Sequence, residues 1–199
     1  MRPERYANVH LKKAMESNGV HRRRVEVRKY LVISRVLVRL TGEKGCVKRA
    51  KKEVKSLGKL RDLEVASCIP LPHYELGDLD MKDCMMRKVF GSRLLVAERV
   101  FLLYHELNKE MKLHPLRKTI REALFLLESL GIVDERLKAL AKELGRLRDQ
   151  QLMAQLCEGK EIDFDVDELR LKAKDFIREL LSITEFDHIK CKLHDRNNI

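Results

Sequence analysis

Apolar residues recur every three or four positions along most of this chain, which is the spacing of amphipathic helices. Pro occurs only four times and Gly nine times in 199 residues, and the abundant Leu, Lys, Glu, Arg and Ala favour helix over strand. We therefore expect an all-α protein with helices over residues 4–17, 20–40, 43–68, 81–112, 114–130, 133–157 and 165–182.

Turn residues separate these expected helices. Gly19, Gly42 and Gly131 each follow a helical pattern directly, as glycines that end helices do. Pro70 and Pro72 stop the third helix, because proline cannot continue a helical hydrogen-bond pattern. Residues 69–80 are therefore expected to be a loop that connects two halves of the chain, whereas the tail after residue 185 has weak patterning.

The expected helix over residues 20–40 is unusual because its cations form one row. At about 100° per residue, these side chains fall in one sector of the helix: His21, Arg24, Arg28, Arg35 and Arg39. Val, Leu and Ile occupy almost every other direction, so the helix should lie in the interior and carry its cationic row with it. Buried like charges repel one another and lose hydration, and we expect a polyanion to compensate them.

The second half of the chain repeats the pattern of the first. One set recurs 93 residues later: His21, Arg24 and Arg28 correspond to His114, Arg117 and Arg121. Another recurs 87 residues later: the LGKLRD segment at 57–62 corresponds to the LGRLRD segment at 144–149. His, Arg, Gly and Asp rarely match twice in one order by chance. We expect one domain over residues 1–199, with repeat units at about 4–68 and 81–157 that form two pseudo-symmetric antiparallel bundles. Both cationic rows should then line one shared groove or channel that is free of neutralising carboxylates.

These motifs also carry a family resemblance. The segments H-x2-RV-x2-RK from His21 and H-x-LRK-x2-R-x3-F-x-LE from His114, with both LGxLRD segments, resemble the CHAD domain, the conserved histidine α-helical domain, over residues 5–180. The resemblance implies two related helical bundles and a module that binds inorganic polyphosphate through basic residues along its internal surface. The chain departs from the family, which more often has Arg or Tyr, at Leu31, Glu122, Leu124 and Phe125.

The residue types in these rows suit polyphosphate, a flexible string of phosphoryl groups with oxygens on every side. Arg offers a planar fork to two oxygens and Lys a mobile point charge, so affinity should rise with polymer length and fall with added salt. Phosphate or sulfate should act as small mimics. Asp62 and Asp149 are expected to hold an arginine in place instead. The predicted polyphosphate-binding residues are His21, Arg24, Arg28, Lys29, Arg35, Arg39, Lys48, Lys51, Lys55, Arg61, His114, Arg117, Lys118, Arg121, Lys138, Lys142 and Arg148.

The net charge supports an anionic partner. It is formally +11 and unevenly distributed, since residues 1–61 hold 19 Lys and Arg against 5 Asp and Glu, whereas residues 62–199 hold 23 against 26. An asymmetry of this size indicates a dedicated anion-facing region.

A nucleic-acid-binding module, for RNA in particular, is the alternative, since nucleic acids are polyanions as well. Aromatic residues make up only 5% of the chain and Trp is absent, which leaves few surfaces on which bases could stack. A helix that reads duplex DNA must be exposed, whereas the helix over residues 20–40 is apolar enough to be inside. A scaffold protein whose charge is incidental is a third possibility.

The sequence contains no pattern that predicts catalysis. It has no Walker loop, no glycine-rich strand-to-helix turn and no ExExK pattern, and it lacks the clustered carboxylates that hold Mg²⁺ for phosphoryl transfer. His188, Cys191 and His194 stand three apart but lack a fourth ligand for zinc. We therefore expect no enzyme activity, no cofactor and no bound metal.

The cysteines and the apolar runs bear on location. Five cysteines are odd in number and show no paired spacing, so we expect reduced structural thiols. No apolar run reaches membrane-spanning length, and the first ten residues lack the apolar centre of a signal peptide. We expect a cytoplasmic protein without a membrane partner.

Overall fold

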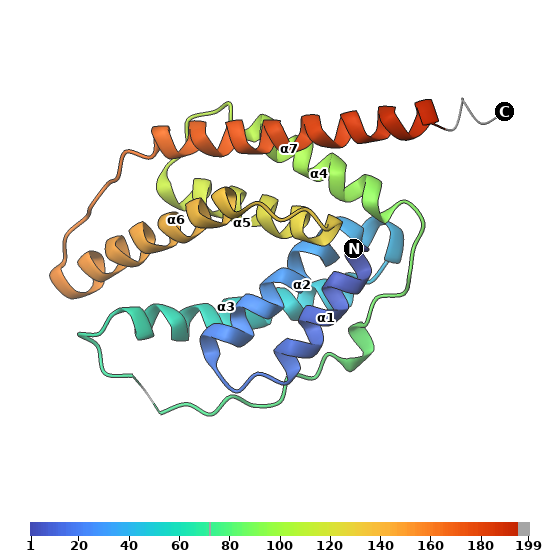
Figure 1. Cartoon of the computed structure of the whole chain (residues 1–199). Coiled ribbons are helices and arrows are strands. Elements are labelled where there is room, and N and C mark those ends of the chain that lie inside the picture. Colours follow the sequence, from blue (N-terminus) through green and yellow to red (C-terminus); the bar gives the residue numbers. More distant parts are fainter. Residues whose placement is uncertain (72, 195–199) are drawn as a thin grey trace.

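The computed structural model describes residues 1–71 and 73–194, with side chains described as far as residue 182. Within these residues the protein is all-helical, as predicted, and contains no strand (Figure 1). None of the described helices is both long and apolar enough to cross a membrane. The elements are α1 (Pro3–Met15), α2 (Val20–Thr41), α3 (Lys44–Val65), the turn η1 (Lys82–Cys84), α4 (Ser92–Glu106), α5 (Leu113–Leu130), α6 (Glu135–Met153), the π turn η2 (Ala154–Glu158) and α7 (Asp167–His194).

The helices pack as two sets that meet in the middle of the molecule (Figure 1). In the first set, α2 packs against α1 and α3. In the second, α5 packs against α4 and α6, and α7, drawn in red in Figure 1, lies across α4 and α6. The two sets meet where α1 and α2 each contact α4 and α5, and where α3 contacts α6. The contacts of α2 with α5 and of α3 with α6 bring four helices together at the centre of the structure.

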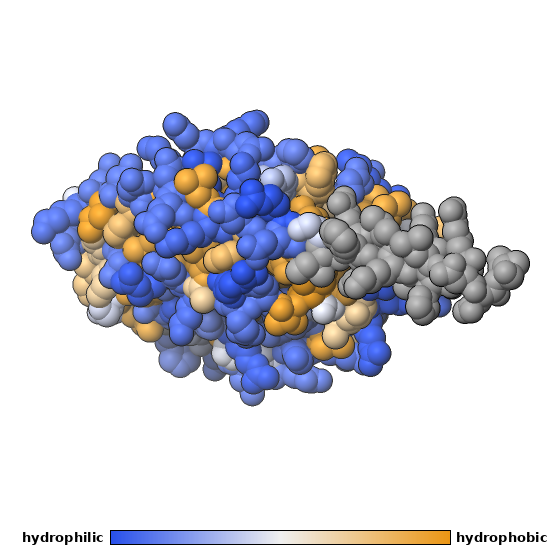
Figure 2. Space-filling model, turned by 45° about the horizontal axis from the view of Figure 1, so that its top comes forward, coloured by the Kyte–Doolittle hydropathy of each residue, from blue (hydrophilic) through white to orange (hydrophobic). Residues whose placement is uncertain are grey.

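One hydrophobic cluster runs through all seven helices. Its largest fully buried side chains include Tyr30, Ile33 and Leu37 of α2 and Leu116 and Ile120 of α5. Burial of a side chain of this size contributes roughly 2 kcal/mol, so the contact between the two sets is strongly stabilised. Hydrophilic residues cover most of the outer face shown in Figure 2, with smaller apolar areas between them.

Gly131 ends α5 in the way that the sequence predicts. Its φ of 89° lies in the left-handed region, which side chains other than glycine rarely adopt. The N–H of Gly131 donates to the carbonyl of Glu128, and the N–H of Ile132 donates to the carbonyl of Leu127, both at 3.0 Å. These bonds satisfy the last carbonyls of the helix.

The prediction of one helix over residues 81–112 is wrong at its N-terminal end, because α4 begins eleven residues later. Before α4 the chain forms only η1 and a non-helical segment. Asn8 of α1 fixes this segment, since its amide donates to the carbonyl of Met86 at 2.9 Å and accepts from the N–H of Met86 at 2.8 Å. The buried Glu4 accepts from the N–H of Val89. Hydrogen bonds to a distant helix therefore override the local helical pattern here.

The same prediction is also wrong at its C-terminal end, because α4 ends at Glu106, six residues before the predicted end at 112. The other helix boundaries lie close to their predicted positions, with two exceptions near the end of the chain. α6 ends at Met153 and continues as the π turn η2. α7 begins near the predicted position but continues to His194, well past the predicted end at residue 182. The last five residues of the predicted weak tail lie outside the described part of the chain.

Two disulfides connect distant parts of the chain, so the expectation of reduced thiols is wrong for four cysteines. Cys46 in α3 is bonded to Cys84 in η1, and Cys68 after α3 is bonded to Cys157 in η2. The paired residues are 38 and 89 positions apart, with Cα–Cα distances of 5.5 and 5.7 Å. Spacing in the sequence cannot reveal such pairs, because only the fold brings them together. The side chain of Cys191 lies outside the described residues.

Asp134 caps the N-terminus of α6, and we expect its loss to destabilise the fold. Its carboxylate accepts from the N–H of Leu137 at 2.9 Å. Asp134→Ala should lower the free energy of unfolding by about 1 kcal/mol and the Tm by about 3 °C. Thermal unfolding followed by circular dichroism measures this, with the exposed Asp78→Ala as a control that should change little. Equal effects of the two substitutions would contradict the capping role.

Candidate polyanion-binding site

A small enclosed cavity of about 120 Å³ lies where α2, α3, α5 and α6 meet. Each of the four helices contributes polar side chains to it, and most of them are cations. Apart from the two aspartates, all of these polar residues belong to the predicted polyphosphate-binding set. We call this site the cationic cavity, and its polar lining consists of His21, Arg24, Arg61, Asp62, His114, Arg117, Arg121, Arg148 and Asp149.

Helix geometry explains why these side chains converge. His21 and Arg24 lie at the N-terminal end of α2, three residues apart and therefore on one face. His114 and Arg117 have the same positions in α5. The Arg-Asp pairs come from the C-terminal halves of α3 and α6. A Cβ added to Gly58 of α3 would lie 3.3 Å from Nη2 of Arg24, so the glycine leaves space for the guanidinium group.

The partly buried arginines of α2 and α5 repel one another. The pKa of Arg28 is lowered to about 8, first by burial and then by the charge of Arg121 and of two further arginines. The pKa of Arg121 is lowered to about 10, first by burial and then by Arg117 and Arg24. These cations therefore raise the free energy of the folded chain, and an anion bound among them would lower it.

Three carboxylates offset part of this charge. Asp62 and Asp149 line the cavity, and Oε2 of Glu64 lies 3.4 Å from Nη1 of Arg61. Oδ2 of Asp149 lies 3.7 Å from Nη2 of Arg61. Burial lowers the pKa of Arg24, and the attraction of Asp62 opposes this only in part. Asp149 acts on Arg117 in the same way. The expectation of a groove free of carboxylates is therefore wrong, although five arginines face only two aspartates.

Arg24 and Arg117 each have a buried donor without an acceptor. Their Nε atoms are inaccessible to solvent and form no hydrogen bond among the described residues. A buried donor that lacks a partner costs roughly 1–3 kcal/mol, and more if it is charged. The two arginines correspond in the predicted repeat and line one cavity. A ligand that presents anionic oxygens to both would satisfy these donors.

His21 and His114 stand at the start of the two cationic rows. Partial burial is the main reason that the pKa of His21 is lowered, and repulsion by Arg61 adds to it. The pKa of His114 is lowered in the same way, with Arg148 as the first repelling charge. Neutral imidazole therefore predominates near pH 7, and a neighbouring phosphate would favour protonation.

Two larger pockets adjoin the cationic cavity. The first, of about 580 Å³, shares His21, Arg117, Arg121 and Asp149 with the cavity and extends along α6 past Lys138, Lys142 and Arg146. We call it the basic pocket. The second, of about 490 Å³, shares two cavity residues and also contains two acidic residues of the loop before α7. The positive surface therefore continues mainly into the basic pocket.

Lys29 is already paired within the fold. Its Nζ lies 3.1 Å from Oε2 of Glu128, and the same carboxylate oxygen accepts a hydrogen bond from the hydroxyl of Tyr6. The ammonium group also lies 5.3 Å from the ring centre of Phe125. Although Lys29 follows Arg28 in the sequence, its charge is balanced by Glu128 and does not line the cationic cavity.

Arg35 and Arg39 are not brought to the cationic cavity. They line a separate pocket of about 340 Å³ that also contains Glu98 and Glu122. Because a helix rises about 1.5 Å per residue, Arg39 lies about 27 Å along α2 from His21. Sharing one face of a long helix therefore did not place these residues in one site.

The remaining predicted lysines are exposed. Lys138 and Lys142 line the basic pocket, whereas four others do not line the cationic cavity: Lys48, Lys51 and Lys55 of α3 and Lys118 of α5. Sequence reasoning did not single out Arg146, which also lines the basic pocket. The sequence does mark this position as basic in both repeats, because Arg146 occupies the variable position of the second LGxLRD segment, where the first has Lys59.

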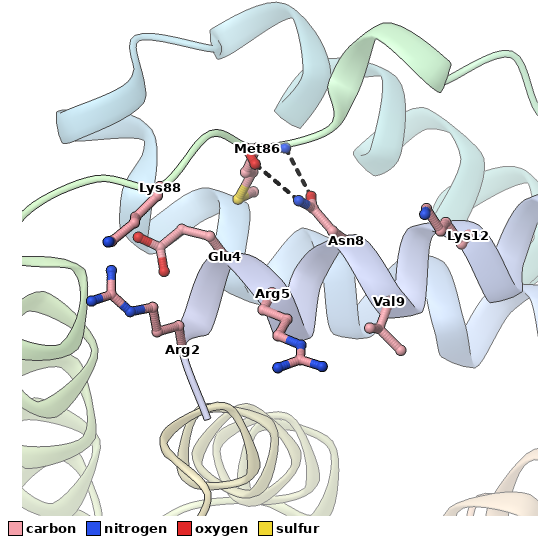
Figure 3. A pocket seen from close by; sticks show the side chains of 8 residues that line it. All are labelled: Arg2, Glu4, Arg5, Asn8, Val9, Lys12, Met86 and Lys88. Atoms are coloured by element: carbon pink, nitrogen blue, oxygen red, sulfur yellow. Dashed lines mark hydrogen bonds between the residues drawn. The ribbon is translucent and has the colours of Figure 1, made fainter.

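A separate pocket of about 370 Å³ lies on α1 (Figure 3). In this view Asn8 forms its two hydrogen bonds with Met86, and the ends of Arg2 and Lys88 point toward the carboxylate of Glu4. None of these residues was predicted to bind a ligand. The lining consists of Arg2, Glu4, Arg5, Asn8, Val9, Lys12, Met86 and Lys88.

One group of described residues has the spacing of metal ligands. The ligand atoms of Cys46, Asp83 and Cys84 lie within 4.8 Å of one another. Its two sulfurs are bonded to each other, and Asp83 forms an ion pair with Arg49, so all three side chains have partners. The weak zinc candidate lies outside the described side chains: His188, Cys191 and His194.

Comparisons with known proteins give no assignment. The chain matches no family model, no curated protein and no solved structure. A function has to be inferred from the chemistry of the cationic cavity and the basic pocket.

Removal of one repelling charge should stabilise the protein. Arg28→Met keeps the length of the side chain but removes a mostly buried cation, and we expect the free energy of unfolding to rise by about 1–2 kcal/mol and the Tm by about 3–6 °C. Differential scanning calorimetry measures the change. The control is Arg22→Met, an exposed position on the same helix, which should alter stability by less than about 0.5 kcal/mol. A lower Tm for Arg28→Met would show that the repulsion is not destabilising.

Proposed function

We propose that this chain is a non-catalytic module that binds inorganic polyphosphate in the cationic cavity and the basic pocket. The observation that carries the proposal is the pair of buried Nε donors of Arg24 and Arg117 that have no acceptor among the described residues. Both arginines lie among like charges, and burial lowers the pKa of each. A ligand with several anionic oxygens would accept these hydrogen bonds and offset the repulsion at the same time.

The length of the cationic surface favours a chain of phosphates over a single anion. Lys138 in the basic pocket and Arg148 in the cationic cavity are ten residues apart on α6, which corresponds to about 15 Å. One phosphate cannot contact both side chains, whereas a polymer can. The cations between them would then act on successive phosphoryl groups, and affinity would accumulate along the chain.

Matching surroundings of corresponding residues support the predicted duplication. Burial and neighbouring arginines lower the pKa of both Arg28 and Arg121. Partial burial and one arginine of the LGxLRD segment lower the pKa of both His21 and His114. We therefore propose that the two sets of helices are related bundles and that the chain is a member of the CHAD family. A cytoplasmic location stays a prediction.

The proposal includes no catalytic step and no cofactor. Phosphoryl transfer needs Mg²⁺ held by carboxylates. In the cationic cavity, Asp62 and Asp149 each attract an arginine, and the described residues form no group of three metal ligands there. Binding without reaction is the chemistry that these residues support.

RNA is the rival ligand, and the lining of the site supports it less. Bases bind single-strand modules largely by stacking on aromatic rings. Phe125 is the aromatic residue that lines the basic pocket, and it is only 4% exposed. Backbone phosphates of RNA could contact the cations, but its bases would find little stacking surface.

Competition binding tests the ligand class. At physiological salt, long-chain polyphosphate should bind at least tenfold more tightly than mass-matched RNA or DNA, and its affinity should fall with added salt. Fluorescence polarisation with a labelled polyphosphate and unlabelled competitors measures this ranking. A clear preference for RNA would reverse it.

The same assay assigns the site. Each charge-assisted hydrogen bond contributes about 1.5–3 kcal/mol, so Arg24→Gln with Arg117→Gln should weaken polyphosphate binding roughly 100-fold. Circular dichroism should show unchanged helix content. Lys12→Gln with Lys13→Gln removes the same charge from exposed positions on α1 and should change affinity only slightly. Equal losses in the two double variants would mean that only net charge matters.

Polyphosphate affinity should rise as the pH falls. Binding beside His21 and His114 would raise pKa values that the fold lowers, so binding takes up protons. The gain in affinity is complete below the pKa of the two histidines in the unbound protein, and it is lost above their pKa in the complex. We expect roughly tenfold tighter binding at pH 6 than at pH 8, since one unit of pKa corresponds to about 1.4 kcal/mol.

Calorimetric titration over this pH range measures the effect. His21→Gln with His114→Gln should flatten the profile below about pH 7.5. Identical profiles for the variant and the natural chain would exclude the histidines as the groups that take up the protons.

A further inference from the structure

Four helices form a closed ring around the cationic cavity. α2 packs against α3 and α5, and α6 packs against the same two helices. All four contribute side chains to the lining. A polymer that passes from one adjoining pocket through the cavity to the other therefore has a helix on every side.

The contact between α3 and α6 is the smallest in this ring. Its ion pair joins Nη2 of Arg61 to Oδ2 of Asp149 at 3.7 Å, with side chains that are 27% and 44% exposed. A partly exposed ion pair of this kind is weak. Beyond it, Cys68 and Cys157 form the disulfide that joins the segment after α3 to η2. The ring is therefore closed covalently at its weakest contact.

Residues close to the disulfide line both pockets that adjoin the cavity. Val65 and Met153, which line the basic pocket, precede Cys68 by three residues and Cys157 by four. Gln155, which lines the second pocket, precedes Cys157 by two residues. A polymer that entered sideways, between α3 and α6, would have to pass the position of this bond.

The two disulfides differ in exposure to solvent. Cys68 is exposed and Cys157 is partly exposed, whereas Cys46 is only 7% exposed and Cys84 is fully buried. Thiol–disulfide exchange requires direct attack on a sulfur atom, so accessibility governs its rate. A dissolved dithiol should therefore reduce Cys68–Cys157 well before Cys46–Cys84.

We propose that the Cys68–Cys157 disulfide decides which polyanions enter the cationic cavity. With the bond intact, the ring admits only a linear polymer that can thread a free end through it. With the bond reduced, α3 and α6 can separate, and a polymer without a free end can enter sideways. This inference rests on the proposed function, because it concerns access to the same site.

The reductant is a dithiol. One thiolate of the dithiol attacks a sulfur of the disulfide, which forms a mixed disulfide and releases the other cysteine as a thiolate that takes up a proton. The second thiol of the reagent then displaces the remaining cysteine. Two electrons and two protons pass to Cys68 and Cys157, and the reagent leaves as its cyclic disulfide.

The test compares the binding of three ligands to the oxidised and the dithiothreitol-reduced chain. The ligands are tripolyphosphate, long-chain polyphosphate with free ends, and the same polymer with a bulky protein coupled to each end. The oxidised protein should bind the first two and bind the end-blocked polymer at least tenfold more weakly. Reduction should restore binding of the end-blocked polymer and leave tripolyphosphate unchanged, because the cations lie on the four helices and not on the disulfide.

Two variants separate this effect from general loosening of the fold. Cys68→Ala with Cys157→Ala should bind the end-blocked polymer without reductant. Cys46→Ala with Cys84→Ala removes the other disulfide and should behave like the oxidised natural chain. If either variant fails to fold, partial reduction of the natural chain provides the same comparison. Mass spectrometry then shows which of the two disulfides has opened.

The outcomes distinguish the two proposals. Equal binding of free and end-blocked polymer by the oxidised protein would overturn threading and leave polyphosphate binding intact. If the end-blocked polymer binds only after the Cys46–Cys84 bond has opened, the proposed role of Cys68–Cys157 would also be overturned. Failure of every polyphosphate to bind in either redox state would overturn the proposed function itself and, with it, this inference.

Discussion

Repulsion among partly buried arginines at the contact of α2 and α5 is the constraint on which the rest of the structure depends. Burial and neighbouring charges lower the pKa of Arg28 to about 8 and that of Arg121 to about 10. Such a cluster persists because the same helices bury large apolar side chains on their other faces, among them Tyr30 and Ile120. At roughly 2 kcal/mol for each such side chain, hydrophobic burial offsets the repulsion. The core, and not the site's own interactions, holds these cations together.

This repulsion lowers the stability of the folded chain and would favour the binding of an anion. Asp62 and Asp149 reduce the repulsion but leave the arginines in excess. The Nε atoms of Arg24 and Arg117 remain without acceptors among the described residues. Groups whose pKa is strongly shifted and whose donors are unsatisfied are commonly functional. A polyanion would relieve both conditions, since it would supply charge and acceptors together.

The disulfides complete the arrangement away from the charged centre. Cys46–Cys84 is buried and ties α3 to the segment before α4, which Asn8 of α1 also fixes. Cys68–Cys157 is more exposed and closes the ring of helices beside the cavity. The first bond therefore belongs to the fold, whereas the second borders the path that a ligand would take.

The sequence by itself determined the helices and the grouping of Arg24 with Arg28, because the helical hydrogen bond joins residues four apart and spacing alone assigns a side chain to a face. Only the tertiary structure decided which faces meet. It paired Lys29 with Glu128, 99 residues away, and placed Arg39 in another pocket. It also held residues 85–91 out of a helix and joined cysteines up to 89 residues apart. These outcomes depend on packing between distant segments, and no local pattern of residues records that packing.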